Sequence, residues 1–221
     1  MGKSNFNLLL ISASPRKNKS QTFVLANQVL DGCNPEISDV IHLCDYKIEF
    51  CKHCERCHKK ILDCPIKDDV KWILQKMLDA DGIILATPNY INQVTGAMKT
   101  LFDRSSHFIH CKRLLDKYVV GVVSSGSGRD KPVIDYLKHY AFTCGAQFVG
   151  AVSSSVPISE EKKKQAFDLG VKLASAIKNR KIFPAQTKII QQGKAHFKNL
   201  MMARKIDWQG EYDYWKEKGW L

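Results

Sequence analysis

Short apolar runs alternate along the chain with longer stretches in which apolar residues recur every three or four positions. The short runs end at small or polar residues, which is typical of buried parallel strands. They predict strands over residues 6–12, 37–43, 82–87, 118–124 and 147–153. The longer stretches predict helices over residues 20–30, 68–78, 96–108, 129–142, 159–179 and 189–203. This alternation indicates an α/β fold.

Five strands joined by helices predict one doubly wound parallel sheet with right-handed crossovers. The carboxyl ends of the first, third and fourth strands then meet at the switch point of the sheet, where ligands bind. The alternation of predicted strands and helices ends at Pro184. We therefore predict a domain over residues 1–183, with a cysteine-rich loop at 44–67, and a C-terminal helical arm over 184–221. The arm is expected to pack on the domain or on a partner subunit.

Length and composition fit a domain that needs no cross-links. The chain has 221 residues, of which 44% are hydrophobic, enough for a core of its own. Residues 1–7 are polar, and the apolar run 8–11 is too short for a signal peptide. No stretch reaches the roughly 18 apolar residues that a membrane span needs. We expect a cytoplasmic protein with reduced thiols and no membrane partner.

The formal net charge of +12 raises nucleic acid as a partner, because a basic surface attracts phosphate. The lysines are scattered and become denser only in the last third of the chain. No helix-turn-helix, zinc-finger or RNA-binding motif accompanies them. The sequence therefore argues against nucleic acid and is compatible with small anions or an acidic protein partner.

The loop after the first strand carries the parts of a phosphate site. It combines hydroxyls, amides and a guanidinium with the start of a helix: Ser14, Arg16, Asn18, Ser20, Gln21 and Thr22. Backbone N–H groups and the helix dipole favour an anion there. The loop lacks both the G-x-G-x-x-G and the Walker A patterns, which excludes the usual dinucleotide and P-loop sites. A polar loop that only caps the helix is the alternative.

Two more loops follow the third and fourth strands at the same edge of the sheet. Pro88 ends the third strand, and Asn89, Tyr90 and Asn92 project polar groups and one ring over the crevice. The next loop, residues 124–128, has little side-chain bulk, so a flat ligand can approach its backbone closely. Each loop alone is compatible with an ordinary turn. Together they predict a phosphate at one end of the crevice and a planar, amide-rich ring at the other.

Several segments resemble the flavodoxin-like NADPH-dependent FMN reductase superfamily, namely residues 14–18, 80–90, 96–104 and 213–221. The resemblance implies FMN, a sheet in the order 2-1-3-4-5, and dimers or tetramers with flavins at subunit interfaces. It implies Ser14, Arg16, Ser20, Gln21 and Thr22 at the FMN phosphate. Along the ribityl chain and the isoalloxazine it implies Thr87, Pro88, Asn89, Tyr90 and Ile91. It also implies that Ser125, Gly126, Ser127 and Gly128 reach the ring.

Four of the eight cysteines fall between residues 51 and 64. Two residues separate Cys51 from Cys54 and Cys54 from Cys57, six separate Cys57 from Cys64, and Pro65 follows. Three cysteines at this spacing can surround one face of an iron–sulfur cube, and the longer loop can bring Cys64 to the fourth iron. Zinc usually takes two separate pairs of cysteines, although nearby histidines could substitute as ligands. A zinc site and a loop without metal therefore remain alternatives.

This motif on this fold resembles the iron–sulfur flavoproteins, a branch of the same superfamily. The resemblance implies a 4Fe-4S cluster on Cys51, Cys54, Cys57 and Cys64, beside FMN. The pair of cofactors would pass electrons between a one-electron, ferredoxin-like carrier and FMN, for reduction of a small-molecule acceptor. Basic residues around the motif could dock an acidic carrier: Lys52, Arg56, Lys59 and Lys60.

Two other functions stay open. An NAD(P)H-dependent FMN or quinone reductase would use the same flavin with a purely structural cysteine loop. A regulator that binds nucleic acid would use the basic surface. No acid–base triad is expected, because the flavin carries the chemistry. We expect the remaining cysteines to be buried apolar residues (Cys33, Cys44, Cys111 and Cys144), and His107 and His110 to serve packing or helix capping.

Overall fold

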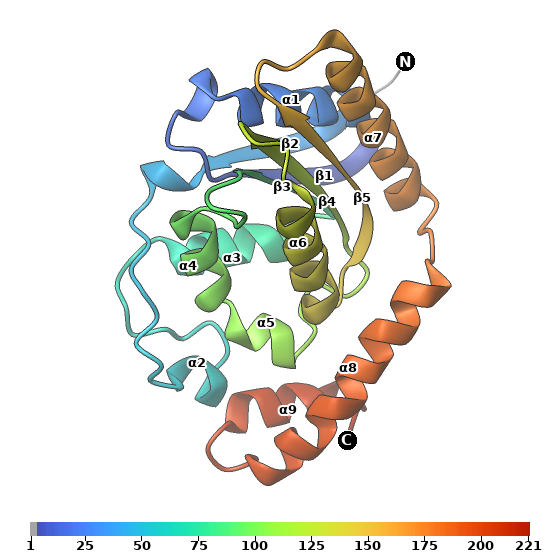
Figure 1. Cartoon of the computed structure of the whole chain (residues 1–221). Coiled ribbons are helices and arrows are strands. Elements are labelled where there is room, and N and C mark those ends of the chain that lie inside the picture. The colour runs from blue at the N-terminus through green and yellow to red at the C-terminus, as the bar shows by residue number, and fades with distance from the viewer. Residues whose placement is uncertain (1–3) are drawn as a thin grey trace.

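The computed structural model describes residues 4–221. Five parallel strands form one sheet in the order β2-β1-β3-β4-β5, which confirms the predicted fold class and strand order. They are β1 Ser4–Ser12, β2 Pro35–His42, β3 Gly82–Pro88, β4 Tyr118–Ser125 and β5 Gln147–Ser155. Helices lie on both faces (Figure 1), as parallel strands rich in Val, Ile and Leu require. Residues 1–3 of the predicted domain lie outside the described residues.

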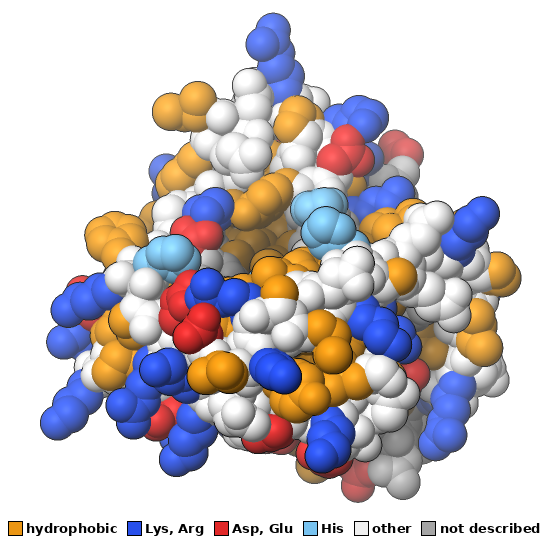
Figure 2. Space-filling view, turned by 90° about the horizontal axis from the view of Figure 1, so that it is seen from below, with side chains coloured by type: hydrophobic (Ala, Val, Ile, Leu, Met, Phe, Trp, Pro, Cys, Tyr) orange, Lys and Arg blue, Asp and Glu red, His pale blue; other side chains and the backbone are white. Residues whose placement is uncertain are grey.

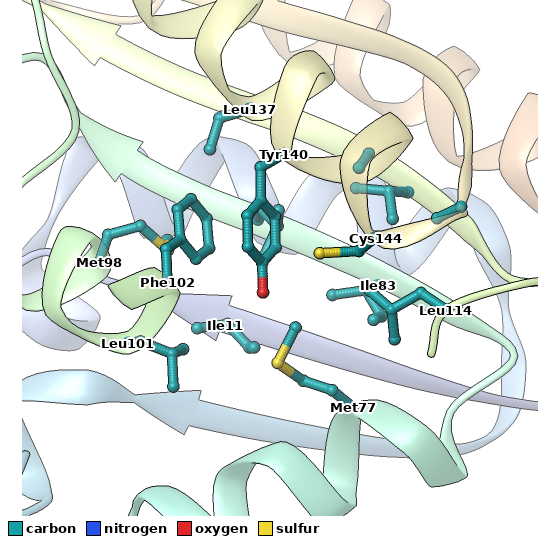
Figure 3. Packing of buried hydrophobic residues seen from close by; sticks show 14 of the residues in the cluster. Ile11, Met77, Ile83, Met98, Leu101, Phe102, Leu114, Leu137, Tyr140 and Cys144 are labelled. Carbon is teal, nitrogen blue, oxygen red and sulfur yellow. The ribbon is translucent and has the colours of Figure 1, made fainter. Parts of the chain in front are cut away.

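One face of the sheet is covered by α1 Gln21–Cys33 and α7 Glu160–Lys178 (Figure 1). These helices cross closely, because Gly32 and Gly170 leave no side chain between their backbones. The other face is covered by α3 Val70–Asp79, α4 Gly96–Asp103 and α6 Lys131–Cys144. Figure 3 shows part of that second core, where the rings of Phe102 and Tyr140 stack with centroids 3.6 Å apart.

The helix predicted over residues 96–108 is wrong in extent, because it divides into α4 and the short α5 Ser106–His110. Ser105 explains the interruption: its hydroxyl donates to the carbonyl of Phe102 at 2.8 Å and also pairs with the Tyr140 hydroxyl at 2.9 Å. A serine that bonds to nearby backbone in this way competes with the helical ladder. The interruption places Arg104 and His107 toward the cysteine-rich loop, which holds the unpredicted one-turn α2 Arg56–Lys59.

The C-terminal segment forms α8 Pro184–Ala203 and α9 Gln209–Glu217, which lie below the domain in Figure 1. Pro184 begins α8 at its first turn, five residues before the predicted start, since proline suits that position. Met201, Trp208 and Trp215 are buried against Cys111, so the segment has an apolar contact with the rest of the chain. Among residues 4–221 there is no helix of the length and hydropathy that a membrane crossing requires.

Candidate functional site

One pocket of about 200 Å³ lies at the carboxyl ends of β1, β3 and β4. The pairing of the parallel strands places these ends at the same edge of the sheet, since Ser12 pairs with Ala86, and Pro88 pairs with Ser124. The lining residues come from the loops that follow the strands: Ser14, Arg16, Ser20, Gln21, Thr22, Pro88, Asn89, Tyr90, Ser124, Ser125, Gly126 and Val156. We call this hollow the switch-point pocket.

Hydroxyl groups hold the walls of the switch-point pocket together. Ser20 caps α1, and its Oγ accepts a hydrogen bond from Phe23 N at 3.3 Å. Thr22 Oγ1 and Ser124 Oγ lie 2.5 Å apart and join α1 to β4 inside the protein. Ser125 Oγ accepts a hydrogen bond from the backbone N–H of Gly128 at 2.8 Å, which stabilises the loop after β4. The pocket is thus a concave surface of hydroxyls at a helix N-terminus, a setting that favours an anion.

Two hydrogen bonds fix Asn89 directly after β3, at the edge of the switch-point pocket. Its Nδ2 donates to the carbonyl of Arg129 at 2.9 Å, and its backbone N–H donates to the carbonyl of Ser124 at 2.8 Å. Its Oδ1 is buried and has no hydrogen-bond partner among residues 4–221. A buried carbonyl oxygen without a donor costs free energy, so this atom is ready to accept a hydrogen bond from a ligand.

A second pocket, of about 310 Å³, is lined by all four cysteines of the compact motif. We call it the cysteine pocket. Cys51 and Cys54 are exposed, while Cys57 and Cys64 are partly buried. The backbone around them is irregular, with left-handed conformations at His53, Glu55 and Leu62. Such a backbone does not form a regular helix or strand, and it turns the thiols toward a common space.

Buried charges anchor the cysteine loop to the domain. Asp68 Oδ2 accepts from the backbone N–H of Glu49 at 3.0 Å, and Asp69 Oδ2 accepts from that of Lys47 at 2.7 Å. The buried Arg104 guanidinium pairs with Asp68 and donates to the carbonyl of Glu49 at 2.7 Å. Both ends of the loop are therefore held at fixed points. These two acidic residues, at the start of the helix predicted over residues 68–78, serve as the anchors.

The thiols lie in different electrostatic settings. Burial raises the pKa of Cys57 to about 11, although a contact between its Sγ and the Ser106 hydroxyl at 3.7 Å acts in the opposite direction. Arg104 Nη2 donates to Cys64 Sγ at 3.3 Å. The backbone N–H of His53 donates to Cys51 Sγ at 3.4 Å. N–H donors thus face Cys51 and Cys64, and the Ser106 hydroxyl is within reach of Cys57.

The C-terminal arm closes one side of the cysteine pocket. Glu211 of α9 is fully buried, and its two oxygens lie 2.6 Å from His58 Nδ1 and 3.0 Å from His110 Nδ1. Trp208 stacks on both imidazole rings, with centroids 4.6 and 4.8 Å away. Distances of 2.6 and 3.0 Å are those of N–H···O bonds. Glu211 and Trp208 therefore attach the arm to His58 of the cysteine loop and to His110 of α5.

Comparison with known proteins identifies the relatives of this chain. A profile of the family described as NADPH-dependent FMN reductase matches residues 6–161. The chain belongs to this family. An iron–sulfur flavoprotein of Archaeoglobus fulgidus is 32% identical over 221 residues, which cover 96% of this chain and 98% of the relative. An iron–sulfur flavoprotein of Clostridioides difficile is 24% identical over 222 residues, with the same coverage of 96% and 98%.

These relatives place the chain in the iron–sulfur flavoprotein branch of the FMN reductase family, as the resemblance had indicated. A solved structure of a flavodoxin, WrbA-like protein from Agrobacterium tumefaciens has the same fold, with a TM-score of 0.58 and 19% identity. That alignment covers 80% of this chain and 100% of the other. The chain is therefore a flavin-dependent oxidoreductase with a flavodoxin-like fold.

Of the sixteen residues predicted to contact the flavin, ten line the switch-point pocket. The others do not line it: Asn18, Thr87, Ile91, Asn92, Ser127 and Gly128. Asn18 instead pairs with His42 Nε2 at 2.8 Å, and the Thr87 hydroxyl contacts Pro88 and Thr95. Ile91 is 97% exposed. Their contact with a cofactor stays a prediction.

Two lining residues are not among the predicted flavin contacts, namely Ser124 and Val156. The predicted crevice loop 124–128 includes Ser124, whose hydroxyl faces Thr22 rather than solvent. Val156 follows β5, and the sequence pattern does not mark the carboxyl end of that strand as part of the crevice. One expectation for the other cysteines is wrong: Cys44 is exposed, whereas Cys33, Cys111 and Cys144 are buried as predicted. Cys44 lies in the short 3₁₀ helix η2 Leu43–Asp45 after β2, in which Leu43 is buried and Cys44 is left on the outer side.

Proposed function

We propose that this oxidoreductase binds FMN in the switch-point pocket and a 4Fe-4S cluster on Cys51, Cys54, Cys57 and Cys64. It would transfer electrons between a ferredoxin-like carrier and FMN, for reduction of a small-molecule acceptor. The observation that carries the proposal is that all four thiols line one pocket beside the buried cation Arg104. The names of its iron–sulfur flavoprotein relatives support the same assignment.

The cysteine pocket suits an anionic cluster. Its donor set is sulfur, in the compact spacing that cubane clusters use. Arg104 supplies a positive charge and a hydrogen bond at Cys64, which compensates part of the negative charge of ligated thiolates. The raised pKa of Cys57, caused by burial, fits a ligand whose proton is displaced by iron, rather than a free reactive thiol. Zinc at the same cysteines is the alternative that metal analysis distinguishes.

The switch-point pocket suits FMN. The N-terminus of α1, the hydroxyls of Ser14 and Ser20 and the exposed Arg16 together fit a phosphate. On the opposite side Gly126 has open space around it, since a Cβ there would have no neighbour within 4 Å. The unpartnered Asn89 Oδ1 fits a ring N–H. FMN can accept one or two electrons and a cluster one, which is the chemistry that the bound pair would supply.

The surface beside the cysteine pocket suits an acidic carrier. Lys52, Arg56, Lys59 and Lys60 are all exposed around the motif. Figure 2 shows that basic side chains on the underside of the molecule are spread out rather than gathered in one patch. Dispersed positive charges still attract an anionic protein as it approaches, and they do not form the continuous basic groove expected for nucleic acid. Binding of a carrier by this surface should weaken as ionic strength rises.

The exposed rim of the switch-point pocket supports a homodimer or homotetramer with flavin at the interface. Tyr90 is 50%, Ile91 97% and Val156 52% exposed. Large apolar side chains gathered on one rim are typical of an interaction surface. If this proposal holds, Ile91→Asp should shift the protein toward monomer in analytical ultracentrifugation.

A second candidate function is an NAD(P)H-dependent FMN or quinone reductase, which the family description favours. Anaerobic stopped-flow measurement of flavin absorbance separates the two. We expect a reduced ferredoxin-type carrier to reduce the flavin of the parent protein rapidly, and that of Cys54→Ser slowly. Equally rapid reduction of both proteins by NADPH, with no response to the carrier, would establish the reductase instead.

A further inference from the structure

The junction between α4 and α5 forms one wall of the cysteine pocket. It contributes Arg104, Ser106 and His107 to the lining. Arg104 contacts Cys64 Sγ at 3.3 Å, and Ser106 Oγ contacts Cys57 Sγ at 3.7 Å. Two of the three side chains on this wall therefore already face a thiol. The wall exists because Ser105 interrupts the helix at this position.

The third side chain, His107, has no comparable contact. It is 1% exposed, and neither ring nitrogen has a hydrogen-bond partner anywhere in residues 4–221. Its ring meets Phe108 edge-on, with centroids 5.0 Å apart, which is an apolar contact. Burial lowers the pKa of His107 to about 3, with the Arg113 charge acting in the same direction. The imidazole is therefore neutral, with one N–H and one bare nitrogen.

A buried N–H without an acceptor is costly, and native proteins rarely keep one without a reason. Packing alone does not explain it, because an apolar side chain would fill this space without the cost. The four cysteines line the same pocket as His107, so sulfur held by these cysteines is a candidate acceptor for the buried N–H. Hydrogen bonds to the sulfurs of an iron–sulfur cluster are a known means by which a protein sets the reduction potential.

We propose that His107 donates a hydrogen bond to a sulfur of the cluster and thereby raises its reduction potential. This inference rests on the proposed function. Reduction adds one electron to the cluster, and the added negative charge lies partly on sulfur. A hydrogen bond to sulfur is therefore stronger in the reduced than in the oxidised state. His107 would tune the electron carrier without serving as a ligand.

The test is a potentiometric titration of the anaerobic holoprotein, followed by EPR of the reduced cluster. In His107→Leu and His107→Phe we expect reduction to be about tenfold less favourable, which is about 59 mV toward negative potential for one electron. His107→Gln should recover part of the shift, because its amide can donate. The control His139→Gln changes an exposed histidine on α6 and should leave the potential unchanged.

Unchanged potentials in cluster-containing His107→Leu and His107→Phe would overturn the inference while leaving the proposed function intact. If both variants lose iron and sulfide, pulsed EPR of the parent protein decides, with histidine that carries ¹⁵N only in the imidazole ring, so that the backbone N–H of His53 at Cys51 does not contribute. A weak ¹⁵N coupling to the reduced cluster is expected, and its absence would also overturn the inference. A parent protein without any cluster would instead contradict the proposed function.

Discussion

Arg104 and Asp68 form a buried ion pair below the cysteine pocket. Two guanidinium nitrogens contact the two carboxylate oxygens at 2.5 and 3.1 Å, and the side chains are only 2% and 1% exposed. The same guanidinium contacts the Glu49 carbonyl and Cys64 Sγ. One arginine at the end of α4 thus joins both ends of the cysteine loop to the domain.

Asp68→Asn should destabilise the protein by about 3–5 kcal/mol, because it leaves the buried guanidinium without its counter-charge. Urea unfolding at pH 7, followed by circular dichroism, measures this loss. The matched control is Asp135→Asn, which removes an exposed partner of Lys131. We expect that change to alter the free energy of unfolding by less than about 1 kcal/mol. Equal effects of the two substitutions would contradict a stabilising role for the buried pair.

The same pair predicts a pH dependence. Burial alone would raise the pKa of Asp68, but hydrogen bonds from Arg104 and from the Glu49 N–H outweigh it, so the folded pKa lies below the usual 3.8. A lowered folded pKa means that the stabilisation is present in full above the unfolded pKa and is lost as pH falls through the folded value. The difference in unfolding free energy between the parent and Asp68→Asn should therefore be constant from pH 6 to 7. Below about pH 4 it should shrink.

Glu211→Ala should loosen the C-terminal arm. The substitution leaves the Nδ1 atoms of His58 and His110 without their shared acceptor, at a cost of about 1–3 kcal/mol for each unsatisfied group. Hydrogen exchange of α9 and of the cysteine loop should accelerate together. Glu217→Ala, which changes an exposed residue of α9, is the control. Faster exchange in α9 alone would show that the arm does not hold the loop.

Gly170→Ala tests the close crossing of α1 and α7. A Cβ at Gly170 would overlap the backbone oxygen of Val29, so the helices must separate. We expect a loss of about 3 kcal/mol and a melting temperature lower by roughly 6–12 °C. Gly96→Ala, where a Cβ has open space, is the control and should be neutral or slightly stabilising. A small change in the free energy of unfolding for Gly170→Ala would mean that α1 and α7 can separate at little cost.

Arg16→Met tests the phosphate end of the switch-point pocket. Loss of one charged contact should weaken FMN binding by roughly tenfold or more, since such bonds contribute about 1.5–3 kcal/mol. Riboflavin, which lacks the phosphate, should bind both proteins equally in a fluorescence titration of the apoprotein. Lys138→Met is the control, because it removes a positive charge from an exposed residue of α6 that does not line the pocket. Equal weakening for the two flavins would place Arg16 elsewhere along the ligand.

The sheet could be predicted from sequence because β1, β3 and β4 are continuous buried apolar runs. The edge strands β2 and β5 are more exposed, and they followed from shorter apolar runs at their place in the alternation of strands and helices. The loops after β1, β3 and β4 followed from strand order, so most residues of the switch-point pocket did too. What could not be predicted depends on contacts between distant segments. His107 is adjacent to the cysteines only because Ser105 interrupts a helix, and Glu211 reaches His58 across 153 residues of sequence. The partner of Asn18 could not be predicted either, because a polar loop residue has several partners within reach; here it pairs with His42.

The proposed function requires that the four cysteines hold a cluster beside bound FMN. The content of iron and acid-labile sulfide per FMN, in anaerobically purified protein, tests this requirement. We expect about four of each per flavin, and a loss of both with retention of FMN in Cys54→Ser. FMN without iron, or with one zinc per chain, would contradict it and would leave the NAD(P)H-dependent reductase as the function of this chain.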